Sequence, residues 1–234
     1  MPEIDGICFD LFSTLVHKKP GNPFFGKVAD ELGLDLARWK PAYDELHDDT
    51  MASIVPGIVA RVVLSAKAAD VRVAPDAAEA AVHRHFGDFV ASMEVDAQAV
   101  PLLERLRTGG TSLALVTNAS DHAEWLFDRL GLRECFDVTV FSHRVGRLKP
   151  HPGIYRSATD RLGIAASRCA FVGDGQHDEL RGAREVGMTT VLVDRRLPHT
   201  AAARAHADFV VRDLDEVGTV LDGLTVSPDL NSRI

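Results

Sequence analysis

Short, continuous apolar runs that alternate with helical patterns most constrain how this chain can fold. Runs of this kind are typical of strands that are buried on both faces, as in a parallel sheet. We expect strands over residues 4–9, 112–116, 138–141, 169–172, 189–193 and 209–211. We expect helices over residues 100–106, 121–130, 153–162 and 179–186. This alternation predicts an α/β protein with a Rossmann-like, doubly wound parallel sheet that helices cover on both faces.

Residues 17–96 interrupt the alternation. The segment contains no convincing strand and is rich in Ala, Leu, Asp and Glu. Its pattern predicts helices near residues 22–33, 35–50, 55–70 and 76–92. A helical insertion between the first two strands would stand over the strand ends as a cap. We therefore expect a core of residues 1–16 and 97–234 and an all-helical cap of residues 17–96, with hinges near residues 16–20 and 95–100.

The composition disfavours several classes of partner. Asp and Glu number 34 against 26 Lys and Arg, and the resulting net charge of -8 disfavours nucleic acid and anionic membranes. No apolar run has the length of a membrane span, and Glu3, Asp5 and Asp10 make a poor signal peptide. The three cysteines lack a paired spacing, which is typical of a reducing compartment. We expect a cytoplasmic monomer or homodimer with a small-molecule substrate, and a frayed tail over residues 225–234.

Polar residues that can carry chemistry stand at the ends of expected strands. Asp10, Thr117 and Asp174 each come directly after, or one residue after, an apolar run. In open parallel α/β sheets, sites form outside the carboxyl ends of the strands. We therefore expect these three side chains to converge at one edge of the sheet.

Four segments, in this order, resemble the motifs of the haloacid dehalogenase superfamily of aspartate-nucleophile hydrolases. They are Asp10 in Phe-Asp-Leu-Phe-Ser-Thr-Leu, Thr117 in Leu-Val-Thr-Asn, Lys149 in Leu-Lys-Pro-His-Pro-Gly-Ile-Tyr, and Asp174 with Asp178 in Phe-Val-Gly-Asp-Gly-Gln-His-Asp. The resemblance covers residues 4–15 and about 97–212, and the helical insertion resembles the type-one cap of that superfamily.

The resemblance implies a role for each of these residues. Asp10 would be the nucleophile, because attack on phosphorus or on an α-carbon needs an ionised carboxylate in line with the leaving group. Thr14 would be a further catalytic residue of the first segment. Thr117, Asn118 and Lys149 would hold the anionic part of the substrate, with Lys149 also neutralising charge near Asp10.

The resemblance also implies a cofactor, Mg²⁺. Its oxygen ligands would come from Asp10, Asp174 and the backbone carbonyl of Phe12. Asp178 would act through a bound water or by orienting its neighbours.

Phe12 departs from the common phosphatase pattern. Most phosphatases of this type carry an Asp two residues after the nucleophile, which protonates the leaving alkoxide and later activates water. Such acid–base help is worth roughly 10²–10⁴-fold, and a phenyl ring cannot supply it. Either another group does so, with His177 as the first candidate, or the leaving group needs no proton. A halide, an anomeric sugar oxygen and an acyl oxygen meet that condition.

Phe12 and Asp174 favour different activities. The L-2-haloacid dehalogenases of the same superfamily also carry an aromatic residue at the position of Phe12, but they are metal-free, with Ser and Asn in the loop that contains Asp174 here. Without a cation, Asp174 would repel Asp10, so Asp174 favours Mg²⁺ and phosphoryl transfer. We predict a Mg²⁺-dependent phosphatase for a small phosphorylated metabolite with a good leaving group. The alternatives are an L-2-haloacid dehalogenase-type hydrolase and a catalytically weak scaffold.

Overall fold

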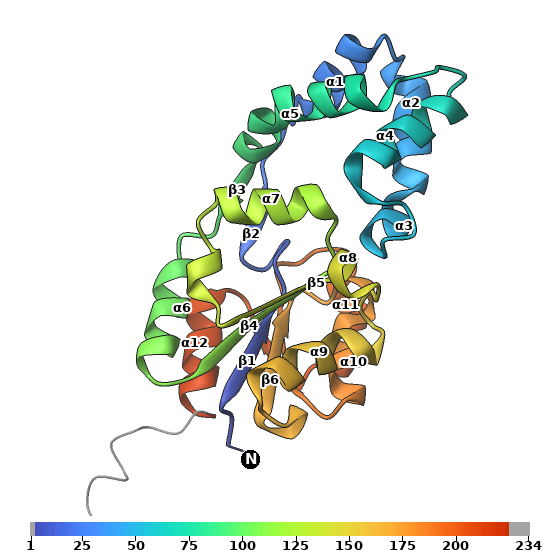
Figure 1. Cartoon of the computed structure of the whole chain (residues 1–234). Helices are drawn as coiled ribbons and strands as arrows, with labels where there is room; N and C mark the ends of the chain where they lie inside the picture. The colour runs from blue at the N-terminus through green and yellow to red at the C-terminus, as the bar shows by residue number, and fades with distance from the viewer. Residues whose placement is uncertain (1–2, 225–234) are drawn as a thin grey trace, which may run out of the picture.

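The computed structural model describes residues 3–224, so residues 1–2 and the expected frayed tail over residues 225–234 lie outside the described part. Within residues 3–224 the core strands form a six-stranded sheet in the order β5-β4-β1-β6-β7-β8, and each neighbouring pair is parallel. The strands are β1 (Gly6–Phe9), β4 (Ser112–Thr117), β5 (Val138–Phe141), β6 (Cys169–Gly173), β7 (Thr189–Val193) and β8 (Phe209–Val211). The chain builds outward from β1 to one edge and then to the other (Figure 1), which confirms the doubly wound α/β fold.

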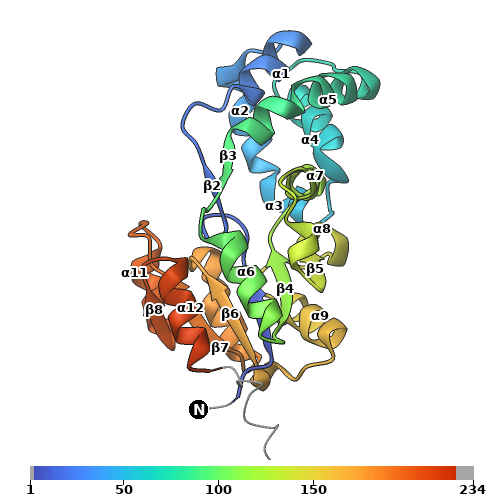
Figure 2. The same ribbon diagram turned by 90° about the vertical axis from the view of Figure 1, so that its left-hand side faces the viewer.

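Helices cover both faces of this sheet, as Figures 1 and 2 show. One face carries α6 (Ala99–Thr108) and α12 (Leu214–Asp222), and the other carries α9 (Pro152–Leu162) and α10 (Glu179–Glu185). In the central strand β1, Ile7 and Phe9 pack with the first layer, whereas Cys8 packs with the second. Every position of β1 is therefore buried, which is why its sequence is a continuous apolar run.

Short elements connect the strands to the covering helices. Three helices follow the carboxyl ends of β4, β5 and β7: α7 (Asp121–Arg129), α8 (Ser142–Val145) and α11 (Thr200–Ala203). The 3-10 turns are η1 (Arg133–Cys135), η2 (Ala166–Arg168), η3 (Gln176–Asp178) and η4 (Arg204–His206). Among the helices of residues 3–224, none combines the length and the apolar character needed to cross a bilayer.

The inserted segment, residues 17–96, is described throughout and contains five helices. They are α1 (Phe24–Leu32), α2 (Leu36–Glu45), α3 (His47–Met51), α4 (Gly57–Ala68) and α5 (Pro75–Ala91). The single helix expected over residues 35–50 is wrong, because the chain leaves the α-helical conformation at Leu46 (φ -87°, ψ 10°). Arg61 Nε donates to the carbonyl of Tyr43 at 2.7 Å. That carbonyl would accept from the N–H of His47 in a continuous helix, so a contact from α4 helps to end α2.

Two short strands connect the inserted helices to the core. Val16–Lys18 (β2) and Met93–Val95 (β3) pair antiparallel, with His17 opposite Glu94. The expectation that residues 17–96 contain no strand is therefore wrong at both ends of the segment. Each strand is too short to show a pattern of its own, and only the pairing of distant parts of the chain forms this ribbon. Both views place α1–α5 beyond the carboxyl edge of the sheet, at the end of this ribbon.

The inserted helices also contact the core directly. The N–H of Ile58 in α4 donates to Asp121 Oδ1 at the start of α7, at 2.9 Å. Ser142 Oγ in α8 lies 2.8 Å from the carbonyl oxygen of Met51 in α3. These contacts enclose the space between α1–α5 and the carboxyl ends of the strands.

Candidate active site

Asp10 comes directly after β1 and is only 6% exposed. Lys149 Nζ forms a short ion pair with its Oδ1 atom, and Thr14 Oγ1 donates to Oδ2 at 3.4 Å. Burial raises the pKa of Asp10; the charge of Lys149 lowers it and that of Asp174 raises it, and the net shift is upward. Lys149 therefore offsets only part of the cost of keeping Asp10 ionised in this position.

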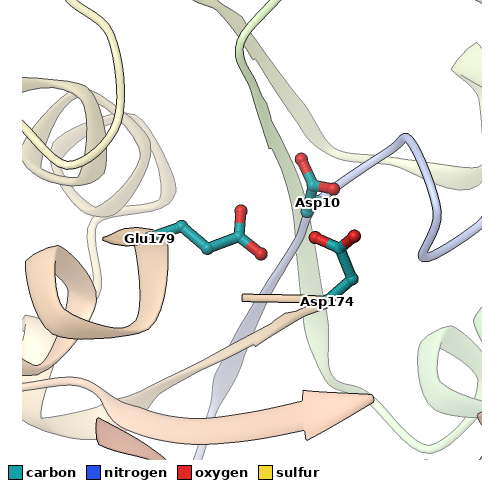
Figure 3. A group of neighbouring side chains, drawn as sticks. All are labelled: Asp10, Asp174 and Glu179. Atoms are coloured by element: carbon teal, nitrogen blue, oxygen red, sulfur yellow. The ribbon is translucent and has the colours of Figure 1, made fainter. Parts of the chain in front are cut away.

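Three buried carboxylates meet at this point. Suitable oxygen atoms of Asp10, Asp174 and Glu179 all lie within 4.8 Å of one another, and Figure 3 shows the three side chains directed toward a common space. Lys149 Nζ lies 2.5 Å from Glu179 Oε2. Burial raises the pKa of Glu179 to about 8 although Lys149 counteracts this shift. The ammonium group of Lys149 does not balance three carboxylates, whereas a divalent cation with oxygen ligands would. The donor set therefore fits Mg²⁺.

The structure does not bring Asp178 into this cluster. Its side chain is 64% exposed and pairs with Arg181 Nη2 at 3.2 Å. His177 and Asp178 both adopt left-handed backbone angles (φ 54° and 55°) directly before α10. At the end of this turn Glu179, rather than Asp178, enters the buried site.

Glu179 is the site residue that the sequence analysis missed, and the surrounding chain holds it tightly. The N–H of Gly175 donates to Oε1 at 2.9 Å, and Tyr155 Oη donates to the Glu179 carbonyl at 2.8 Å. A Cβ atom at Gly173 would lie 2.1 Å from Glu179 Oε1, so only glycine fits beneath this carboxylate. Glu179 lies four residues before Ala183 on the buried face of α10, and this spacing could have identified it.

A second missed contact involves His199, which precedes α11. Its Nε2 atom lies 3.0 Å from Asp174 Oδ2, so the segment after β7 contacts Asp174 through this side chain. No local pattern around His199 predicts this contact, because it joins two loops from neighbouring strands.

Thr117 and Asn118 lie at the end of β4, next to β1 in the sheet, and they differ in their contacts. Thr117 is fully buried, and its Oγ1 atom has no hydrogen-bond partner among residues 3–224. Asn118 Oδ1 accepts from the N–H of Lys149 at 2.7 Å, and its Nδ2 donates to the Lys149 carbonyl at 3.2 Å. Asn118 therefore positions the Lys149 loop, whereas Thr117 as a substrate-binding residue stays a prediction.

A cavity of about 310 Å³ separates Asp10 from the inserted helices. Asp10, Phe12, Lys149 and Glu179 line it from the core, together with His177. Phe12 is half-buried and packs against the main apolar core, so an apolar ring stands where many related enzymes carry an acid. The backbone carbonyl of Phe12 as a metal ligand stays a prediction.

Comparison with known proteins agrees with this geometry. Residues 4–187 match the family model described as haloacid dehalogenase-like hydrolase. The chain belongs to this family of hydrolases. The solved structure of a haloacid dehalogenase-type phosphatase from Thermococcus onnurineus has the same fold, with a TM-score of 0.66 and 22% identity over 95% of this chain and 100% of that one.

Curated relatives of this hydrolase include both phosphatases and a dehalogenase. A phosphatase of Mycobacterium tuberculosis (strain CDC 1551 / Oshkosh) is 34% identical over 138 residues, 58% of this chain and 60% of that protein. The (S)-2-haloacid dehalogenase 2 of Pseudomonas sp. (strain CBS-3) is 24% identical over 231 residues, 95% of this chain and 97% of that one. This chain spans only part of the length of these phosphatase relatives: 60% of the Mycobacterium protein and 53% of a glyceraldehyde 3-phosphate phosphatase of Methanopyrus kandleri.

Proposed function

We propose that this protein is a Mg²⁺-dependent phosphatase that uses Asp10 as its nucleophile. The observation that carries the proposal is the cluster of Asp10, Asp174 and Glu179, whose oxygen atoms lie within 4.8 Å of one another in a buried site. When ionised, three such carboxylates repel one another, and the single ammonium group of Lys149 offsets only part of that repulsion. The phosphatases among the relatives, including a phosphoserine phosphatase of Thermus thermophilus that is 36% identical over 121 residues, give further support.

The chemistry assigns a role to each residue. An Asp10 oxygen forms a bond to phosphorus while the bond from phosphorus to the leaving oxygen breaks. Lys149 and Thr117 bind oxygens of the transferred group, and Thr14 orients the Asp10 carboxylate through its 3.4 Å hydrogen bond. Water then attacks phosphorus, which releases phosphate and restores Asp10. Held by Asp10, Asp174 and Glu179, Mg²⁺ would supply positive charge beside the transferred group.

Phe12 narrows the substrate to one with a good leaving group. A phenyl ring donates no proton, so the leaving oxygen departs as an anion or takes its proton from another group. His177, which is exposed and lines the cavity, is the first candidate for that second route. Phosphates of aryl, acyl or anomeric oxygens suit the first route.

A 2-haloacid dehalogenase is the second candidate, favoured by Phe12 and by the near full-length similarity to the Pseudomonas dehalogenase. In that reaction Asp10 would attack the α-carbon while the carbon–halogen bond breaks, and the halide needs no proton. A catalytically weak scaffold is a third alternative. The cluster of Asp10, Asp174 and Glu179 speaks against both, since neither needs three buried acids at one point.

The test is an assay of phosphate release from 4-nitrophenyl phosphate with Mg²⁺, beside an assay of chloride release from 2-chloropropionate in EDTA. We expect phosphate release that Asp10→Asn abolishes without loss of folding. Chloride release in EDTA, with no phosphatase activity, would establish the dehalogenase instead. Absence of both activities would establish the scaffold.

We further infer that residues 17–96 form a cap that moves on the β2–β3 ribbon, relative to a core of residues 1–16 and 97–234. The contacts of Ile58 with Asp121 and of Met51 with Ser142 then belong to the closed state. The acidic net charge of -8 supports a small-molecule substrate rather than a nucleic-acid or membrane partner. The three cysteines without a paired spacing support a cytoplasmic location.

A further inference from the structure

The cavity wall opposite Asp10 carries polar groups without partners. Tyr43 in α2 is 2% exposed, and Asn22 precedes α1; both line the same cavity as Asp10 and Lys149. Tyr43 Oη and Asn22 Nδ2 are buried atoms with no hydrogen-bond partner in the part of the chain that the structure describes. Burial raises the pKa of Tyr43 to about 12, so its hydroxyl is protonated at neutral pH. Both groups can therefore donate to an acceptor that enters the cavity.

Arg61 in α4 adds a buried positive charge to this wall. It is 2% exposed and lines the cavity. Its guanidinium carbon lies 3.8 Å from the centre of the Tyr43 ring, and Nε donates to the Tyr43 carbonyl at 2.7 Å. Nη1 lies 3.1 Å from His47 Nδ1. Arg61 and Tyr43 thus hold each other in place.

The charge of Arg61 lacks a close carboxylate. Among the described residues, the carboxylate within ion-pair distance is that of Asp44, whose Oδ1 atom lies 4.0 Å from Arg61 Nη2. The side chain of Asp44 is 57% exposed and already binds Lys40 Nζ at 2.6 Å. A buried cation without a close partner is costly. The wall is therefore suited to an anionic group that the protein itself does not supply.

Resting on the proposed phosphatase function, we propose that Arg61, Tyr43 and Asn22 bind a carboxylate of the substrate while Asp10 and Lys149 engage its phosphoryl group. The substrate class is then a small phosphorylated carboxylic acid. A planar carboxylate matches the fork of the guanidinium group and leaves one oxygen for the Tyr43 hydroxyl. A second phosphoryl group would bring two negative charges beside Asp44. The cavity of about 310 Å³ has room for a small metabolite.

Two substrates with nearly the same leaving group separate this inference from the proposed function. They are 4-(carboxymethyl)phenyl phosphate and its amide, 4-(carbamoylmethyl)phenyl phosphate, which differ in the charge at the far end of the ring. We expect wild-type kcat/KM to be at least about tenfold higher for the carboxylate, as one hydrogen bond to a charged group would give. Hydrolysis of both at equal rates would overturn the carboxylate site and leave the phosphatase intact. If 1,4-phenylene bisphosphate is hydrolysed faster than 4-(carboxymethyl)phenyl phosphate, the wall of the cavity binds a phosphoryl group. That result would overturn the carboxylate assignment.

Two variants test the residues themselves. Tyr43→Phe removes a hydroxyl that has no partner, so we expect an unchanged melting temperature and a preference for the carboxylate that falls about tenfold. Arg61→Gln should lower the preference further. Lys67→Gln changes an exposed cation at the end of the same helix, outside the cavity, and should retain the wild-type preference. A wild-type preference in Tyr43→Phe and Arg61→Gln would overturn the assignment.

A binding measurement decides the site even if no phosphate is hydrolysed. The product 4-hydroxyphenylacetate should raise the melting temperature of the metal-free protein more than 4-hydroxyphenylacetamide does, and Tyr43→Phe should reduce that difference. Equal shifts would refute the carboxylate site. If the carboxylate product gives the larger rise in melting temperature but no phosphate ester is hydrolysed, the phosphatase proposal is refuted and the carboxylate site stands.

Discussion

Glu179 Oε2 lies 2.5 Å from Lys149 Nζ, and the two side chains form an ion pair in which both are almost fully buried. The same ammonium group contacts Asp10. Burial lowers the pKa of Lys149, but the charges of Asp10 and Glu179 outweigh burial and raise it. Lys149 therefore stays protonated between two carboxylates, and its charge is shared between Asp10, the proposed nucleophile, and Glu179, a member of the proposed cation site.

The ion pair of Glu179 with Lys149 predicts that Glu179 contributes more to Mg²⁺ binding and activity than its neighbour Asp178. Glu179→Gln should weaken Mg²⁺ binding and activity about 10–100-fold, because it removes a buried charge from the cluster. Asp178→Asn is the matched control: it changes an exposed acid one residue away and should keep activity within about threefold. Titration of Mg²⁺ against initial rate measures both. A larger loss of Mg²⁺ binding and activity in Asp178→Asn than in Glu179→Gln would show that Asp178, and not Glu179, belongs to the site.

Metal removal should abolish activity. Asp10, Asp174 and Glu179 repel one another when ionised, so chelation should stop turnover and Mg²⁺ should raise the melting temperature by binding the folded state. In the Asp174→Asn variant, Mg²⁺ should raise the melting temperature much less than in wild type. The measurement is thermal unfolding with and without Mg²⁺, beside the rate in excess EDTA. Undiminished turnover in EDTA would contradict the cation site.

The raised pKa of Glu179 predicts how stability depends on pH. The pKa of Glu179 rises from 4.5 in the unfolded chain to about 8 in the folded protein. The folded state therefore holds the proton more strongly. This contribution to stability is complete below about pH 4.5 and is lost as the pH rises through about 8. The charge of Asp10 contributes to this rise in pKa, so the two carboxylates influence each other's titration.

The check is thermal unfolding of metal-free protein across this pH range. Wild type should lose stability toward high pH relative to Glu179→Gln, whose curve lacks this loss. Mg²⁺ should restore stability at the high-pH end, where the carboxylates are ionised. Parallel curves for the two proteins would rule out the raised pKa.

The unpaired hydroxyl of Thr117 predicts a loss of activity without a loss of stability. Thr117→Val keeps the shape of a fully buried side chain and removes an atom that has no partner, so the free energy of unfolding should change by less than about 1 kcal/mol. We expect kcat/KM to fall about tenfold or more, because a hydrogen bond to a charged oxygen is lost.

Thr190→Val is the matched control for Thr117→Val. Thr190 is equally buried, but its hydroxyl donates to the carbonyl of His206 at 2.7 Å. This variant should lose about 1–3 kcal/mol of stability and keep its activity. Urea unfolding and steady-state kinetics of the two variants give the comparison. Equal losses of stability would show that the Thr117 hydroxyl is paired in solution.

Phe12 predicts a steep dependence of rate on the pKa of the leaving group. Aryl phosphates of graded acidity should show it, and simple alkyl phosphates should be cleaved far more slowly, by the roughly 10²–10⁴-fold that acid–base help is worth. Phe12→Asp should then raise the rate on alkyl phosphates. A flat dependence, with chemistry rate-limiting, would point to a general acid, and His177→Gln would be the next variant to measure.

The sequence by itself determined the core and several residues of the candidate site. Continuous apolar runs encode strands that are buried on both faces, and β5, β7 and β8 have the predicted bounds. Because the carboxyl ends of parallel strands meet at one edge, the positions of Asp10 and Asp174 along the chain were enough to predict their convergence. These features depend on local pattern and on a general rule of sheet topology.

Only the tertiary structure decided the contacts that depend on chain direction and on distant partners. Two left-handed residues turn the loop after β6, so Glu179 occupies the cluster in place of Asp178. Arg61 helps to end α2 through the Tyr43 carbonyl, and β2 forms by pairing with β3. The pairing of Arg61 with Tyr43 across the cavity from Asp10 has the same origin. Such contacts join residues far apart in the chain, where neither periodicity nor local propensity carries information about them.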